Sequence, residues 1–68
     1  MIWVGIKNGN REVFEYMRTP TQESHGEKYN AVIGTFSTHK AAELMASPAG
    51  YNNPHIQTVA DAERIARY

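Results

Sequence analysis

The Asn8-Gly9 dipeptide constrains the fold of this chain more than any other feature of its sequence. A two-residue hairpin turn of the primed type needs positive φ at both central positions, and Asn and Gly tolerate that conformation best. In the preceding run, apolar Ile2, Val4 and Ile6 alternate with other residues, which is the period of a strand with two different faces. The sequence therefore predicts a β-hairpin whose second strand runs over about residues 11–18.

A two-residue loop also fixes the register of the hairpin and gives each face a different character. The pairs predicted by counting outward from Lys7 and Asn10 are Val4 with Val13, Trp3 with Phe14, and Met1 with Tyr16. The aliphatic face then carries Ile2, Val4, Ile6, Val13 and Met17. The opposite face carries Trp3, Phe14 and Tyr16, with Lys7, Glu12 and Arg18 around them. We expect the aliphatic face to pack on the core.

Residues 19–34 are expected to form a loop followed by a third strand. Residues 19–27 are polar, contain Pro and Gly and show no periodicity, so they are expected to form a mobile loop. A strand is expected over about residues 29–33, and Gly34 at its end would permit close packing.

The carboxy-terminal half predicts two helices separated by turns. Ser37 or Thr38 fits the N-cap of a helix that ends near Ala46, since residues 47–54 are rich in turn-forming residues. Thr58-Val59-Ala60-Asp61 fits a capping box that begins the second helix. The predicted fold class is α+β: a three-stranded antiparallel sheet packed on one helix, with a second, C-terminal helix.

Size and composition limit this fold to one small domain over residues 1–68. Hydrophobic residues make up 41% and charged residues 21% of the chain, which is an ordinary globular composition. There is no Cys, so neither a disulfide nor a thiolate site is possible. No secretory signal or run of apolar residues long enough to span a membrane is present. We expect a cytoplasmic protein that does not associate with membranes.

The charge balance, the histidine spacing and the chain length weigh against several functions. Seven basic and seven acidic residues leave no net charge, which counts against nucleic-acid binding without excluding it. His25, His39 and His55 have no helical i, i+4 spacing, so neither a metal site nor any other cofactor is expected. A chain this short rarely encloses a preorganised pocket, and Ser24-His25 lacks a third, orienting group, so no enzyme activity is expected.

The candidate binding site is the face that carries the large rings. Aromatic residues dominate interface hot spots and also stack on unpaired bases. We therefore expect a partner to bind Trp3, Phe14 and Tyr16, with Lys7 and Arg18 as the polar rim. The alternative is that the C-terminal helix or the 19–27 loop covers the rings and makes a second core layer.

Residues 29–45, YNAVIGTFSTHKAAELM, resemble the third strand and helix of ethylene-response-factor-type DNA-binding domains. That resemblance implies that the free face of the sheet lies in the major groove, as in the similar amino-terminal arms of some phage integrases. Sporulation-related peptidoglycan-binding domains contain a similar strand-to-helix junction. Short uncharacterised bacterial and phage proteins have segments similar to residues 34–43 and 53–63.

Together these observations predict a small binding module of bacterial or phage origin without catalytic activity. The first hypothesis is binding of a protein partner through the aromatic sheet face. The alternative is a nucleic-acid-binding domain that uses the same sheet, and the second alternative is a self-associating homodimer.

Overall fold

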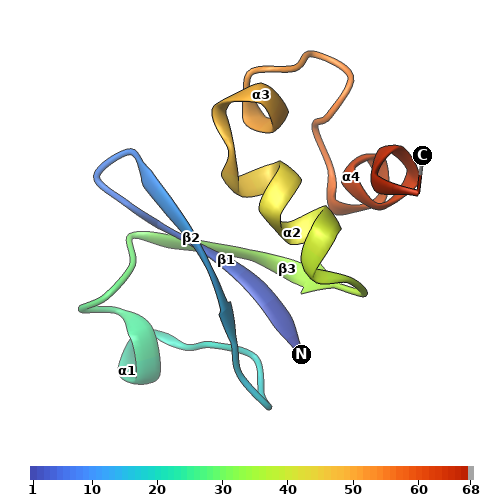
Figure 1. The fold of residues 1–68 in the computed structure, drawn as a ribbon. Helices are drawn as coiled ribbons and strands as arrows, with labels where there is room; N and C mark the ends of the chain where they lie inside the picture. The colour runs from blue at the N-terminus through green and yellow to red at the C-terminus, as the bar shows by residue number, and fades with distance from the viewer. Residues whose placement is uncertain (68) are drawn as a thin grey trace.

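The computed structural model describes residues 1–67 and contains three strands and four helices (Figure 1). In chain order these are β1 Ile2–Lys7, β2 Asn10–Glu15, α1 Gln22–His25, β3 Ala31–Phe36, α2 His39–Ala46, α3 Pro48–Tyr51 and α4 Val59–Ala66. The strands form one antiparallel sheet in the order β2-β1-β3, so the α+β fold class with a C-terminal helix is confirmed. Among residues 1–67, none of the helices has the length and apolar character that a membrane span requires.

The hairpin of β1 and β2 forms as its turn chemistry dictates. Asn8 has a φ of 50° and Gly9 a φ of 85°, which is the conformation of a primed turn. The predicted register is confirmed, because Lys7 faces Asn10, Val4 faces Val13 and Trp3 faces Phe14. Strand β2 ends at Glu15 instead of near residue 18, and the Tyr16 N–H that follows it still donates to the Met1 carbonyl at 3.0 Å.

Strand β3 begins two residues later than predicted and also ends later. The N–H groups of Lys28 and Tyr29 both donate to the carbonyl of His25, which closes a turn and keeps Tyr29 out of the sheet. The chain joins β1 only where the Asn30 N–H donates to the Ile6 carbonyl at 2.6 Å. The pairing of β1 with β3 then shifts register between Ile2 and Trp3.

The aliphatic face of the sheet packs against α2 and α4, and we call it the helix face. The core there consists of Val4, Phe36, Ala41, Ala42, Met45, Ile56 and Ala62, with Ile2, Val13 and Ile33 packed around it. Small Ala side chains on both helices let them approach the β-branched residues of the strands closely. The predicted core face is therefore confirmed, although Ile6 is only half-buried and Met17 lies outside the core.

Both long helices begin at the predicted caps. The Thr38 hydroxyl accepts the Ala41 N–H at 3.2 Å, and Thr58 and Asp61 form the complete capping box of α4. Glu63 of α4 accepts hydrogen bonds from the Ser37 hydroxyl at 2.7 Å and the Ser37 N–H at 2.5 Å. These bonds hold the pKa of the Glu63 carboxyl below its ordinary value and connect α4 to the start of α2.

Two segments predicted as irregular each contain one helical turn. Pro48 occupies a first-turn position of α3, where its missing N–H would have no intrahelical partner anyway. Thr21 and Ser24 form a capping box at α1, so the 19–27 segment is not a structureless loop. Figure 1 shows α1 on one side of the sheet and the other three helices on the opposite side. Residues 19–30, which cross the sheet with α1, are called the strap.

Candidate functional site

The strap covers the face that the sequence predicts as an exposed aromatic surface. Trp3 is only 7% exposed and Tyr29 of the strap only 6%, whereas Phe14 and Tyr16 are half-buried. The prediction that Trp3 lies on an open face is therefore wrong, because the chain supplies its own cover. The cover consists of His25 from the 19–27 segment and of Tyr29, which the sequence predicts as the start of a strand, whereas the C-terminal helix α4 packs on the helix face.

Glycines on two strands make room for the two buried rings. A Cβ atom on Gly5 would lie 2.3 Å from the Tyr29 ring, and one on Gly34 would lie 2.4 Å from the Trp3 indole. Both rings therefore pack directly on the backbone of the strands. The Trp3 Nε1–H also donates to the Tyr16 carbonyl at 3.2 Å, so the indole has no unpaired polar atom to offer a ligand.

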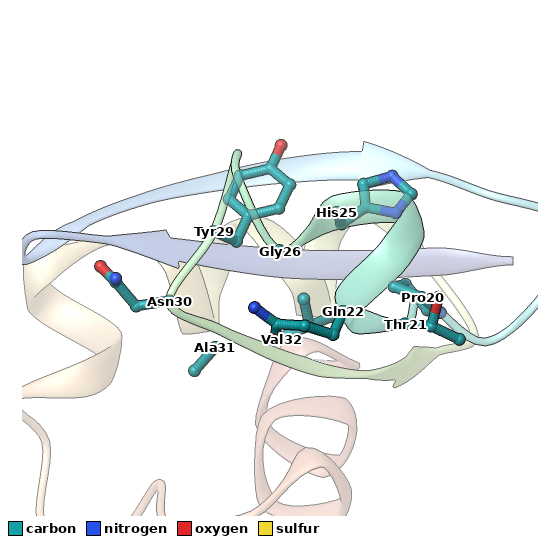
Figure 2. A pocket seen from close by; sticks show the side chains of 9 residues that line it. All are labelled: Pro20, Thr21, Gln22, His25, Gly26, Tyr29, Asn30, Ala31 and Val32. Carbon is teal, nitrogen blue, oxygen red and sulfur yellow. The ribbon is translucent and has the colours of Figure 1, made fainter.

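The other rings form a stack around His25 of α1. Phe14 stacks on Tyr29 with centroids 4.9 Å apart and on His25 at 5.0 Å. Tyr16 meets the imidazole edge-on at 4.6 Å. Figure 2 shows the His25 and Tyr29 rings beside each other on the strap, with a centroid separation of 6.1 Å. The ring cluster thus attaches the strap to β2.

Polar contacts attach the strap at three further points. The Lys7 ammonium donates to the Glu27 carbonyl at 3.0 Å, and the Asn8 N–H donates to the Asn30 Oδ1 at 2.8 Å. The Tyr29 hydroxyl donates to the Glu12 carboxylate. Burial, together with this bond and the nearby negative charge, raises the pKa of Tyr29 to about 12. The strap is thus held by rings and polar bonds more than by an aliphatic core.

A cavity of about 260 Å³ remains between the strap and β3 (Figure 2). His25 lines it, and the Ser24 hydroxyl lies 2.7 Å from the His25 Nδ1. That hydroxyl already accepts the Thr21 N–H at 2.9 Å as part of the α1 capping box. Within residues 1–67, no side chain bonds the other ring nitrogen of His25. The pair therefore serves the local fold and has no orienting third group.

The three histidines lie apart from one another. His25 belongs to the ring cluster, His39 lies 3.7 Å from Glu15 at the start of α2, and His55 is exposed after α3. In the part of the chain that the structure describes, no three His, Asp or Glu side chains gather where they could hold a metal ion.

The exposed members of the predicted site lie at two opposite ends of the hairpin. Lys7 is next to the turn, where it binds the strap, and Arg18 follows β2 at the other end. Beside Arg18 lie two side chains that sequence reasoning did not select: Met17 is 85% exposed and Met1 60% exposed. The Tyr16 N–H bond to the Met1 carbonyl brings these two methionines to the same end of the sheet.

We call Met1, Tyr16, Met17 and Arg18 the hairpin end. Glu15, Tyr16, Met17 and Arg18 line a mainly apolar hollow of about 290 Å³ there. Alternation along a strand over residues 11–18 predicts Met17 on the core face, and this prediction is wrong because β2 ends at Glu15. A shorter second strand would have revealed Met17 as exposed.

Comparison of this chain with family models, with curated proteins and with solved structures finds no match.

Proposed function

We propose that this chain is a small protein-binding module that contacts its partner through the hairpin end. The observation that carries the proposal is the exposure of Met17 and Met1, at 85% and 60%, whereas the other large hydrophobic side chains within residues 1–67 are wholly or partly buried. A chain of 68 residues has little apolar surface to spare for its own core. Two adjacent exposed methionines therefore favour a binding role.

The chemistry of the hairpin end suits an apolar partner segment. Methionine is flexible and polarisable, so it adapts to an irregular apolar surface. The half-buried Tyr16 ring adds a rigid contact beside Met17. Arg18 is exposed and forms no ion pair within residues 1–67, so its guanidinium is free to bind a carboxylate of the partner.

This proposal retains two residues of the aromatic-face hypothesis and gives up three. Tyr16 and Arg18 remain as contact residues. Trp3 is buried in the sheet face under the strap, Phe14 stacks on rings of the strap, and Lys7 bonds the strap.

Site-specific photo-crosslinking tests the proposal. The crosslinking amino acid p-benzoylphenylalanine would replace Met17 in the full chain, expressed in the cells that carry it. A matched chain would carry it in place of Ala60, an exposed residue of α4, the helix that packs on the helix face of the sheet. We expect a discrete protein adduct from position 17 that is absent from position 60. Met17→Glu should abolish co-purification of that protein while leaving the unfolding midpoint unchanged.

The same experiment distinguishes the other binding functions. A position-17 adduct with a second copy of the chain would support the homodimer instead, and a nucleic-acid adduct would support the DNA-binding alternative. Equal labelling from both positions, or none from position 17, would overturn the proposal.

A further inference from the structure

A second surface hollow, unrelated to the hairpin end, lies where the turn end of the sheet meets the segment between α3 and α4. Its volume is about 400 Å³, within the range typical of small-molecule sites. Its apolar lining consists of Ile33, Met45, Ile56 and Val59, and Arg11, Tyr51, Gln57 and Thr58 line the rest. Met45 and Ile56 belong to the core, so the floor of this hollow is as fixed as the core itself.

One cation borders this apolar floor, and the fold holds it in place. The Arg11 guanidinium donates from Nη1 to the Met45 carbonyl at 3.0 Å, near the carboxyl end of α2 where a positive charge is favoured. The guanidinium carbon also lies 4.3 Å from the centre of the Tyr51 ring. Arg11 is half-buried, so these two contacts fix a side chain that would otherwise lose entropy on binding a ligand.

Among residues 1–67, no carboxylate pairs with the remaining donors of Arg11. A guanidinium presents five N–H groups, and Arg11 forms no ion pair within residues 1–67. Asp61, at the start of α4, is already bound elsewhere. Its Oδ2 accepts the N–H groups of Gln57 and Thr58, each at 3.1 Å, and its Oδ1 accepts from Arg64 at 3.1 Å. These hydrogen bonds, that of Gln57 first, hold the pKa of the Asp61 carboxyl below its ordinary value.

We propose that this hollow, the Arg11 pocket, binds a small organic acid. The carboxylate would pair with the free N–H groups of Arg11, and a compact apolar group would lie against Ile33, Ile56 and Val59. A planar guanidinium matches a carboxylate in a two-bond geometry, which a neutral ligand cannot reproduce. Because the lining combines Arg11 and the polar Gln57 and Thr58 with an apolar group of side chains, the ligand class that fits it is an amphipathic carboxylate.

The test is a nuclear magnetic resonance titration of the full chain with 3-phenylpropionate, using its neutral amide as the matched control. We expect amide-proton shifts confined to residues around the Arg11 pocket, with a dissociation constant of about 1 mM for so small a ligand. The amide should bind at least about tenfold more weakly, because it lacks the charge-assisted bonds.

Variants separate binding from folding. Arg11→Met should weaken the acid about tenfold or more and leave the amide unchanged, whereas Lys28→Met, an exposed charge on the strap, should change neither. Because Arg11 also bonds α2, Val59→Phe provides a second variant that fills the hollow while keeping the guanidinium. It should block both ligands without loss of the folded spectrum. Equal affinity for acid and amide, unchanged affinity in Arg11→Met, shifts elsewhere on the molecule, or no shifts at about 10 mM would each overturn the proposal.

Discussion

The helix face and the strap face belong to the same three strands, yet they are covered by different means. On the helix face, β-branched side chains pack against alanines of α2 and α4 in one continuous core. On the strap face, two rings lie on Gly5 and Gly34, and polar bonds hold the segment that brings Tyr29 there.

This difference indicates how stability is distributed. The helix-face core supplies most of the buried apolar contact of α2 and α4, so we expect its loss to unfold the whole domain. The strap contributes one deeply buried side chain, Tyr29, and its helix α1 buries none. We infer that the strap opens locally at a lower free energy than the whole domain unfolds.

The largest expected effect is on the helix face. Val4 is completely buried, and Val4→Ala would leave a cavity between the sheet and α2. We expect a loss of about 2–3 kcal/mol in the free energy of unfolding, with the strap and core unfolding together. Urea denaturation followed by Trp3 fluorescence measures this, and Met17→Ala is the matched control because Met17 is exposed. A loss no larger than that of the control would contradict the comparison.

A smaller and more local effect is expected for Gly5→Ala. The new methyl group would overlap the Tyr29 ring, so the ring and the strap must move, at about 1–2 kcal/mol. Hydrogen exchange should accelerate most in residues 19–30 and little in α2. In the double variant with Tyr29→Leu, the cost of Gly5→Ala should shrink. An unchanged cost would show that the overlap with Tyr29 is not its cause.

The smallest expected effect is that of Tyr29→Phe, which keeps the ring and removes only the bond to Glu12. At neutral pH the loss should be about 1 kcal/mol. The pKa of Tyr29 rises from 10.0 to about 12 on folding, so the folded state holds this proton more tightly. The resulting stabilisation is complete below pH 10.0 and is lost as the pH rises through about 12. The stability gap between the native chain and Tyr29→Phe should therefore narrow over that interval, and a constant gap would contradict the assignment.

Much of the helix face follows from local sequence rules. The Asn8-Gly9 turn sets the register, the register divides the faces, and the hydroxyls of Thr38 and Thr58 mark where the long helices begin. Each of these features depends on residues close in sequence, whose preferences tertiary packing does not override.

The strap face could not be predicted in the same way. Tyr29 has the residue type and position of a strand beginning, and only the turn at His25 directs it across the sheet. Its packing on Gly5 joins residues whose proximity depends on the whole path of the strap. The Arg11 pocket could not be predicted either, because Arg11 and Tyr51 come into contact only when β2, α2 and α3 are packed together.

Because the Tyr29 and Trp3 rings pack on glycine backbone, substitutions at the glycines and at the rings are coupled in any sequence that adopts this fold. The Tyr29 ring fills the space that a side chain at position 5 would need, and the Trp3 ring fills the space that a side chain at position 34 would need. A larger residue at either glycine is compatible only with a smaller one in place of its ring, so each pair should change together or not at all. Such paired changes, seen across a set of homologous sequences, would trace the path of the strap without any coordinates.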